Sequence, residues 1–392
     1  MKKNIILIIT ILLVFQSCSN KKNEVKFEKD GYFYIYATIN NSITGRFILD
    51  TGASGLYLDS TFVKKHSSII KSSLDTARMR GAGATGYKQV LLIKDSIKIN
   101  VGDYSHNFIN SPILKLTDIN GENIAGIIGN DFIENKVLII NNKNLTLKID
   151  TTVNLRNYET ILPFTYVGGR IYLSADITMN ENKIVTPKLL IDLGCPDAII
   201  LNSTYFKSLT TNNILPENII DYTILFGGAL GGNSEGGEFR VKSIKLGNDI
   251  IENPIISFSK DTLGAFSRID YDGLLGNKIL DRYNYAIDYS AQKLYLAKNS
   301  NSKQLLTSSL TGFYAIKIDS LATVISIYYQ SEAYKNGIRL GDTIISINNK
   351  NVKNLTEKEF YNEMKEEGKQ IKVIVLRDEK PFEILFKLKY MI

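Results

Sequence analysis

The sequence is poor in the side chains that serve metal-dependent and nucleophilic hydrolases. Its 392 residues include two cysteines, Cys18 and Cys195, two histidines, His66 and His106, and no tryptophan. These residues lie far apart, they show no zinc-ligand spacing, and no Cys–His or Ser–His–Asp set is apparent. We therefore expect no metal and no cofactor, and metal-dependent hydrolysis and triad chemistry are disfavoured.

The sequence also lacks any long run of charge of one sign. The formal net charge is +7, but the lysines are interspersed with acidic residues, so we expect no nucleic-acid partner. Hydrophobic residues make up 44% and charged residues 22%, as in ordinary soluble globular proteins. The length allows two or three domains with their own cores.

An apolar stretch marks the N-terminus. Lys2-Lys3 precedes residues 5–15, in which Thr10 is the one polar member, and Ser17-Cys18-Ser19 follows. The stretch is too short to span a bilayer but is typical of a signal peptide. The arrangement resembles a Bacteroidetes-type lipoprotein signal, which implies that Cys18 becomes the lipid-modified N-terminus. A plain secretory signal with an incidental cysteine is the alternative.

This resemblance divides the first part of the chain. Residues 1–18 are the expected lipoprotein signal peptide, and the polar residues 19–28 are the expected tether. The resemblance implies a bacterial cell-envelope protein held to the membrane through lipidated Cys18. Because SNKKN after Cys18 lacks an acidic run, the periplasm-facing side is favoured.

An internal repeat organises the middle of the chain. GIIGNDFIENKVLIINNKNLTLKI (126–149) aligns without a gap on GLLGNKILDRYNYAIDYSAQKLYL (273–296). Upstream of each lies a glycine-rich stretch and, before it, an apolar run that ends in Asp-x-Gly: FILDTGAS (47–54) and LLIDLGCP (189–196). The repeated order predicts two lobes of one fold with pseudo-two-fold symmetry.

Strand patterns dominate both lobes. Segments such as YFYIYATI (32–39) and RIYLSADI (170–177) alternate or run apolar between turn residues, whereas helical stretches such as STFVKKHSS (60–68) are short. We predict a mainly β fold, with barrel-like lobes at residues 29–152 and 153–298.

The segment around Asp50 resembles the active-site motif of retropepsin-type aspartic proteases, because Asp-Thr-Gly follows an apolar strand. Gly126–Gly129 resembles the apolar-apolar-Gly element that supports this motif in the family. The resemblance covers roughly residues 30–298. It implies that Asp50 and Asp192 are the catalytic pair, that the substrates are polypeptides, and that the pair is supported by Thr51, Gly52, Ala53, Leu193 and Gly194.

Paired carboxyl groups suit peptide hydrolysis without a covalent intermediate. Two carboxyl groups in contact cannot both ionise, so they share one proton and titrate as a unit. The ionised group takes a proton from water, and the protonated group donates to the carbonyl oxygen of the substrate. Glycine after each aspartate lets the two loops approach closely.

The second loop departs from the family pattern at Leu193. The family has Thr or Ser there, and its hydroxyl bonds across to the other lobe, so only Thr51 can make such a bond in this chain. A hydrogen bond contributes about 0.5–1.5 kcal/mol, and its loss would loosen the pair. Two alternatives stay open: Asp50 is a turn residue that caps a strand, or Asp192 is a relict and Asp50 pairs with Asp50 of a second molecule.

Two glycine turns stand where such proteases carry a flap over the substrate. They are Gly81-Ala82-Gly83 and Gly227-Gly228. Glycine permits both the tight turn and the motion that a flap needs. The alternative is an ordinary hairpin turn.

The end of the chain resembles a second family. After the polar residues 299–309, which we expect to be a linker, residues 331–348 resemble the central signature of bacterial PDZ domains. The resemblance implies a small α/β domain at residues 310–392 that binds a peptide or C-terminal ligand. Its carboxylate-binding loop would be Thr311-Gly312-Phe313-Tyr314. A domain used only for packing is the alternative.

Together these patterns predict a monomeric, lipid-anchored aspartic endopeptidase whose PDZ domain presents or gates polypeptide substrates. One rival is a peptide-binding module in which Leu193 marks weakened or lost catalysis. The other is an assembly protein whose PDZ domain recruits envelope partners.

Overall fold

The computed structural model describes residues 24–81, 86–116, 123–180, 183–225, 232–318 and 320–392. Strands make up 49% of the described residues and helices 14%, which confirms the mainly β prediction. The predicted signal peptide, including Cys18, lies outside the described residues. Among the residues that are described, no helix is long and apolar enough to cross a membrane.

The first lobe folds around a core that includes Phe33, Phe47 and Phe132, each fully buried. Its last hairpin, β11–β12, leads into the second lobe. The elements are β1 (Val25–Asp30), β2 (Tyr32–Ile39), β3 (Ile43–Asp50), β4 (Leu56–Asp59), α1 (Ser60–Lys65), β5 (Asp75–Arg80), β6 (Tyr87–Ile93), β7 (Ile97–Val101), β8 (Tyr104–Phe108), β9 (Ser111–Leu114), β10 (Gly126–Gly129), β11 (Val137–Asn141) and β12 (Thr146–Asp150).

The second lobe repeats this plan with longer excursions. Its elements are β13 (Thr160–Pro163), β14 (Thr165–Val167), β15 (Arg170–Ser174), β16 (Asp176–Asn180), β17 (Lys183–Val185), β18 (Lys188–Ile191), β19 (Ile199–Leu201), α3 (Ser203–Thr211), β20 (Ile219–Ile224), β21 (Ser234–Arg240), β22 (Ser243–Leu246), β23 (Asp249–Glu252), β24 (Ile255–Ser259), β25 (Gly273–Leu275), α4 (Asn277–Leu280), β26 (Tyr283–Asp288) and β27 (Lys293–Lys298).

The sequence repeat appears as the same strand arrangement in each lobe. Strand β10 lies parallel to β3 and antiparallel to β4, and β25 lies in the same way between β18 and β19. The register is also equivalent, because Gly126 pairs with Phe47 and Gly273 pairs with Leu189. In both lobes an apolar strand therefore leads to its aspartate, Asp50 at the end of β3 and Asp192 directly after β18, beside the apolar-apolar-Gly strand.

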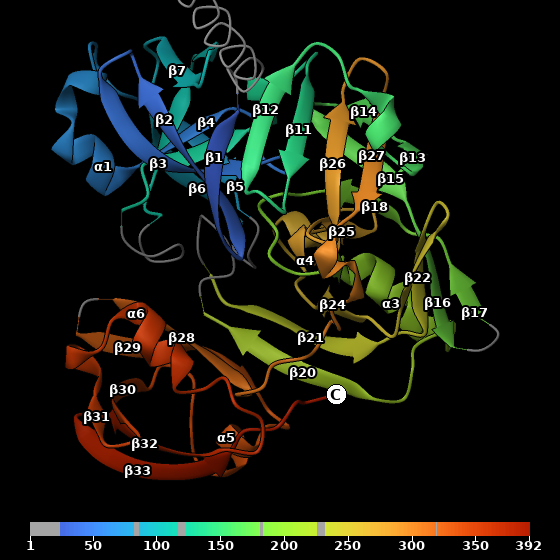
Figure 1. Ribbon diagram of the computed structural model, residues 1–392. Coiled ribbons are helices and arrows are strands. Elements are labelled where there is room, and N and C mark those ends of the chain that lie inside the picture. The colour runs from blue at the N-terminus through green and yellow to red at the C-terminus, as the bar shows by residue number, and fades with distance from the viewer. Residues whose placement is uncertain (1–23, 82–85, 117–122, 181–182, 226–231, 319) are drawn as a thin grey trace, which may run out of the picture.

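The two lobes share one sheet. Its strand order is β13-β27-β26-β11-β12-β1, and β11 of the first lobe pairs with β26 of the second, Val137 opposite Asp288. The four central strands lie side by side in Figure 1. Because backbone hydrogen bonds run across the lobe boundary, this sheet holds the two aspartate loops in a fixed relation.

The structure corrects the predicted tether at residues 19–28, because Val25–Asp30 forms β1. This strand pairs with β2 and with β12. Phe27 is buried and its ring lies 4.7 Å from that of Phe33. The first lobe therefore begins by residue 25, four residues before the predicted boundary.

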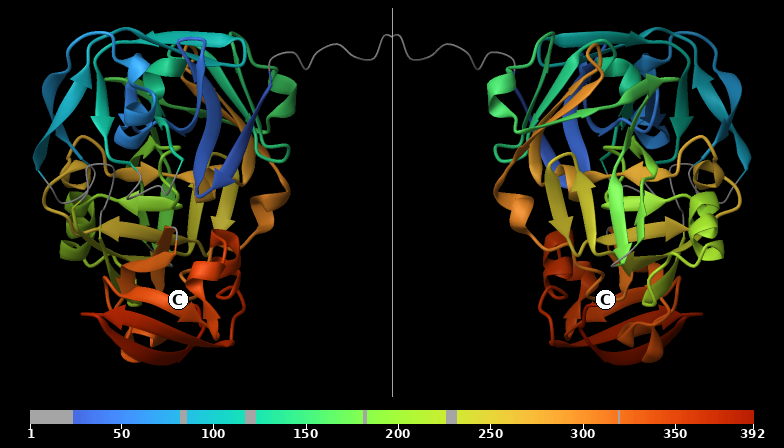
Figure 2. Two further views of the ribbon diagram at one scale, coloured as in Figure 1. Left: turned by 90° about the vertical axis from the view of Figure 1, so that its left-hand side faces the viewer. Right: turned by 90° about the vertical axis from the view of Figure 1, so that its right-hand side faces the viewer.

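The C-terminal domain has its own core, which includes Phe360, Ile371 and Ile344. It packs beneath the lobes in Figures 1 and 2, coloured orange to red. Its elements are β28 (Phe313–Ile318), β29 (Leu321–Tyr328), α5 (Glu332–Lys335), β30 (Thr343–Ile347), β31 (Lys350–Asn351), α6 (Glu357–Asn362), β32 (Gln370–Arg377) and β33 (Lys380–Lys387).

This domain is joined to the second lobe by backbone pairing. Strand β29 lies antiparallel to β20, with Tyr328 opposite Tyr222 and Ser326 opposite Ile224. The predicted linker at 299–309 is also docked, because Ser300–Lys303 forms a turn of 3₁₀ helix and Arg282 donates a hydrogen bond to the carbonyl oxygen of Gln304. The C-terminal domain thus extends a sheet of the second lobe.

Candidate active site

Asp50 and Asp192 meet at the interface between the lobes. Asp50 is the last residue of β3, and Asp192 follows β18. The loops approach so closely that a Cβ on Gly52 would lie 2.6 Å from Cγ of Asp192, and a Cβ on Gly194 would overlap the carboxyl group of Asp50. Only glycine fits at these two positions, because any side chain would force the carboxyl groups apart.

Backbone groups and a mutual hydrogen bond orient the two carboxyl groups. Oδ1 of Asp50 accepts N–H bonds from Gly52 at 2.8 Å and Ala53 at 2.9 Å. Oδ1 of Asp192 accepts one from Gly194 at 2.7 Å. The two side chains also hydrogen-bond to each other. The predicted pair is therefore in contact within one chain.

Both carboxyl groups hold their proton more tightly than an ordinary aspartate does. Burial raises the pKa of Asp50, and hydrogen bonds from Asp192, Ala53 and Gly52 oppose the rise. The pKa of Asp192 is raised well above its usual range, first by burial and then by the charge of Asp50. The pair therefore holds one shared proton, and the two backbone N–H bonds to Asp50, against one to Asp192, favour the ionised form of Asp50.

Thr51 ties the two loops together from one side. Its hydroxyl donates to the carbonyl oxygen of Ile191 at 2.8 Å and accepts from the N–H of Leu193 at 3.0 Å. Thr51 is completely buried. One hydroxyl thus makes two hydrogen bonds across the lobe interface.

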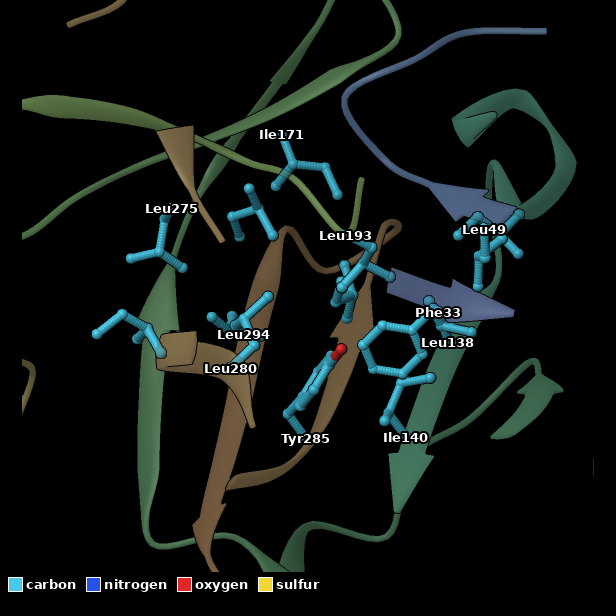
Figure 3. Close-up of a cluster of buried hydrophobic side chains, with 14 of the residues drawn as sticks. Phe33, Leu49, Leu138, Ile140, Ile171, Leu193, Leu275, Leu280, Tyr285 and Leu294 are labelled. Atoms are coloured by element: carbon cyan, nitrogen blue, oxygen red, sulfur yellow. The ribbon is translucent and has the colours of Figure 1, made fainter. Parts of the chain in front are cut away.

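Leu193 fills space in the core between the lobes. The side chain is completely buried, and Figure 3 shows it in the cluster that contains Phe33 and Leu138 of the first lobe and Tyr285 of the second. Burying a leucine side chain contributes about 1.5–3 kcal/mol. Apolar packing therefore offsets the absent hydroxyl, which the comparison with the family motif alone did not reveal.

Two asparagines that we did not predict as site residues connect each lobe to a turn of the other lobe. Asn130 donates through Nδ2 to the carbonyl oxygen of Gly169 at 2.9 Å, and Asn277 donates to that of Gly31 at 3.0 Å. Each bond reaches a turn of the other lobe. Their signal in the sequence was the match of Asn130 with Asn277 in the internal repeat.

The first predicted flap is described only at its base. The carbonyl oxygen of Gly81, just after β5, accepts the N–H of Ala265 at 3.0 Å, and Arg80 donates to Oγ of Ser267 at 2.7 Å. The hairpin β5–β6 therefore contacts the second lobe across the cleft. The other predicted flap residues, Ala82, Gly83, Gly227 and Gly228, lie outside the described residues.

The pair lies in a cavity of about 930 Å³ that all three domains line. This volume is in the range of ligand-binding pockets. Tyr57 and Ile127 line it from the first lobe, Leu190 and Tyr271 from the second, and Thr311, Phe313 and Tyr314 from the C-terminal domain. The predicted carboxylate-binding loop and the aspartate pair thus open on one cavity.

Two tyrosines pack together at the strand that follows the predicted carboxylate-binding loop. Tyr361 of α6 donates its hydroxyl to the carbonyl oxygen of Ala315 at 3.0 Å, and its ring stacks on that of Tyr314 with centroids 6.0 Å apart. Gly312 of the predicted loop has a φ of 71° and faces Ser331.

The described parts of the chain hold no group of three or more His, Cys, Asp or Glu side chains arranged as metal ligands.

Comparison with known proteins identifies two parts of the chain. Residues 35–132 match the family model for aspartyl proteases, and residues 309–388 match that for PDZ domains. The resemblances to aspartic proteases and to PDZ domains are thereby confirmed, and the resemblance to a lipoprotein signal stays a prediction. No curated protein matches the chain. Since Asp192 lies outside both matches, its place in the pair depends on the internal repeat and on the contact with Asp50.

Proposed function

We propose that this chain, in which an aspartyl protease domain is joined to a PDZ domain, is an aspartic endopeptidase. In this proposal a monomer hydrolyses peptide bonds with a water that Asp50 and Asp192 activate. The observation that carries it is the hydrogen-bonded contact between the two carboxyl groups, in a cavity large enough for an extended peptide.

The difference between the two carboxyl groups gives each a role. Ionised Asp50 takes a proton from the water that attacks the peptide carbonyl carbon, and protonated Asp192 donates to the carbonyl oxygen. When the tetrahedral intermediate collapses, the leaving nitrogen receives a proton from the pair. Asp192 suits the acid role because its carboxyl group accepts one backbone N–H bond where that of Asp50 accepts two, so the negative charge is better stabilised on Asp50.

We predict that kcat/KM depends on pH in a bell-shaped manner. Both of its apparent pKa values should lie above the pKa of an ordinary aspartate. Burial raises the pKa of Asp50, so the base becomes available only as pH rises through that raised value. The pKa of Asp192 is raised well above 3.8, so the acid is lost only at a still higher pH. The rate should rise and then fall as both steps are passed. The measurement is kcat/KM for a fluorogenic peptide mixture between acidic and mildly basic pH.

Inhibition by a statine-type transition-state mimic is the control for this assay, since it acts only if the pair performs the hydrolysis. A rate that fell steadily with rising pH from about pH 4 would contradict the raised pKa values. The buried leucine at position 193 favours one second candidate, a weakened fold that binds peptides. Peptide binding without any turnover in the wild type would select that candidate.

We further propose that the PDZ domain presents or gates polypeptide substrates. PDZ domains bind extended peptides by strand addition. Support comes from the cavity that Thr311, Phe313 and Tyr314 share with the aspartate pair, and from the pairing of β29 with β20. If the protein instead acts as an assembly protein, deletion of residues 310–392 should abolish its function in the cell, whereas Asp50→Asn should leave that function intact.

Lipid anchoring at Cys18 is a proposal that depends on the N-terminal motif alone. We predict that Cys18→Ser abolishes incorporation of radiolabelled palmitate and moves the protein from the membrane fraction to the soluble fraction, because the thiol that carries the lipid is lost. The substitution Ser19→Ala is the matched control and should leave both unchanged. Membrane association that persisted in Cys18→Ser would contradict the anchor.

A further inference from the structure

A buried carboxyl group faces the cavity apart from the aspartate pair. Glu238 lies on β21, is 6% exposed, and lines the cavity. Its Oε1 accepts a hydrogen bond from the hydroxyl of Tyr328, on β29 of the PDZ domain, at 2.7 Å. Its Oε2 is buried and has no hydrogen-bond partner among the residues that the structure describes. A buried carboxylate oxygen without a donor is costly, so this atom is suited to receive one from a ligand.

The surroundings of Glu238 carry an excess of negative charge. Asp197 lies close enough to act on it, and burial together with the charge of Asp197 raises the pKa of Glu238 to about 7. Lys278 is the one basic group that opposes this rise, and its ammonium already pairs with Asp197 at 3.2 Å. The carboxyl groups of Glu238 and Asp197 therefore share the one ammonium group of Lys278. A second cation would neutralise the remaining negative charge.

The basic side chains of the cavity are engaged elsewhere. Arg80 donates to Ser267, and Arg268 pairs with Asp270 at 2.7 Å. Arg170 interacts with Tyr172 and with Asp50. None of these acts on the pKa of Glu238. Among the described residues that line the cavity, these three arginines therefore leave Oε2 of Glu238 without a partner.

The acidic surroundings of Glu238 are continuous with the aspartate pair. Asp197 belongs to the loop that follows Asp192. Between them, burial raises the pKa of the Cys195 thiol, and the charges of Asp192 and Asp197 raise it further. Asp192, Cys195, Asp197 and Glu238 all line the one cavity. A chain bound across the pair can thus place a nearby side chain against Glu238.

We propose that Glu238, with Asp197, forms a subsite that binds the cationic end of a lysine or arginine side chain of a polypeptide. The nitrogen donates to the free Oε2 of Glu238, while the hydroxyl of Tyr328 holds Oε1. The PDZ domain therefore completes a specificity pocket of the protease. This inference rests on the proposed function, because it names a residue preference of the same cleft. A buried polar group that stays unpaired with the wrong ligand discriminates strongly against that ligand.

The test uses two series of N-acetylated, statine-containing peptides in which lysine or norleucine is moved through each position on both sides of the statine. Norleucine keeps the aliphatic chain and lacks the ammonium. Calorimetry on the full-length protein should find one position at which lysine binds at least about tenfold more tightly than norleucine, as expected for a charge-assisted hydrogen bond. Glu238→Gln should remove this preference, and Glu252→Gln, an exposed glutamate outside the cavity, should keep it.

Each result decides the inference. Equal binding of both series by the wild type overturns it, even if Glu238→Gln does not fold, and so does a preference that survives in folded Glu238→Gln. Cleavage is followed in parallel. Turnover without a lysine preference would contradict the subsite but support the proposed protease. A Glu238-dependent lysine preference without turnover would contradict the proposed protease but support the subsite.

Discussion

Asp50→Asn and Asp192→Asn are each expected to lower kcat at least about a thousandfold, within the range that a general acid or base contributes. Asparagine at position 50 can still accept the N–H bonds of Gly52 and Ala53, but it cannot take a proton from water. At position 192 the amide can still donate to Asp50, yet it has no acidic proton to deliver. The geometry is thus kept while the chemistry is removed. The measurement is steady-state turnover of the fluorogenic peptide mixture.

The control for charge is Asp378→Asn, an exposed residue in the turn between β32 and β33. It should leave turnover unchanged. Binding of a statine-free peptide should persist in both active-site variants, which separates lost chemistry from lost structure. Full activity in Asp192→Asn, with none in Asp50→Asn, would contradict the proposed pair. It would favour the alternative in which Asp50 pairs with Asp50 of a second molecule.

The pair could be predicted from the sequence because its signals are local and occur twice. Asp50 and Asp192 each follow an apolar strand, and each lobe repeats the apolar-apolar-Gly element that fixes the register. A repeat of this kind constrains distant residues because two copies of one fold must bury the same face. The same logic would have selected Asn130 and Asn277, whose bonds to the opposite lobes depend on that symmetry.

Other features depend on tertiary contacts that no local pattern records. Strand β1 was missed because it contributes only Val25 and Phe27 as apolar residues between charged ones. The pairing of β29 with β20 joins two strand edges about a hundred residues apart, and edge strands carry little information about their partners. Glu238 stands in a glycine-rich stretch, and a glutamate is usually exposed. Only the fold shows that this one is buried.

The interlobe bonds of Thr51 yield the prediction with the largest expected effect on stability. Thr51→Val keeps the shape of the side chain but leaves the carbonyl group of Ile191 and the N–H of Leu193 without the hydroxyl that each now bonds. A buried group left unsatisfied costs about 1–3 kcal/mol, so the free energy of unfolding should fall by about 2–6 kcal/mol. Urea denaturation followed by far-ultraviolet circular dichroism measures this change. Turnover should also fall, because the two loops lose their shared hydroxyl.

The matched control is Thr165→Val, at an exposed position on β14, which should change the free energy of unfolding by no more than about 0.5 kcal/mol. A loss below about 1 kcal/mol in Thr51→Val would mean that the packing of Leu193 holds the loops without help from the hydroxyl. The two residues act on the same interface by different means: Thr51 contributes directional bonds, and Leu193 contributes buried area. Because buried area is indifferent to small rotations, the directional bonds of the Thr51 hydroxyl add to the shared sheet in fixing the angle at which the loops of Asp50 and Asp192 meet. If turnover of Thr51→Val falls by more than the unfolded fraction of the protein explains, Thr51 acts as a positioning residue.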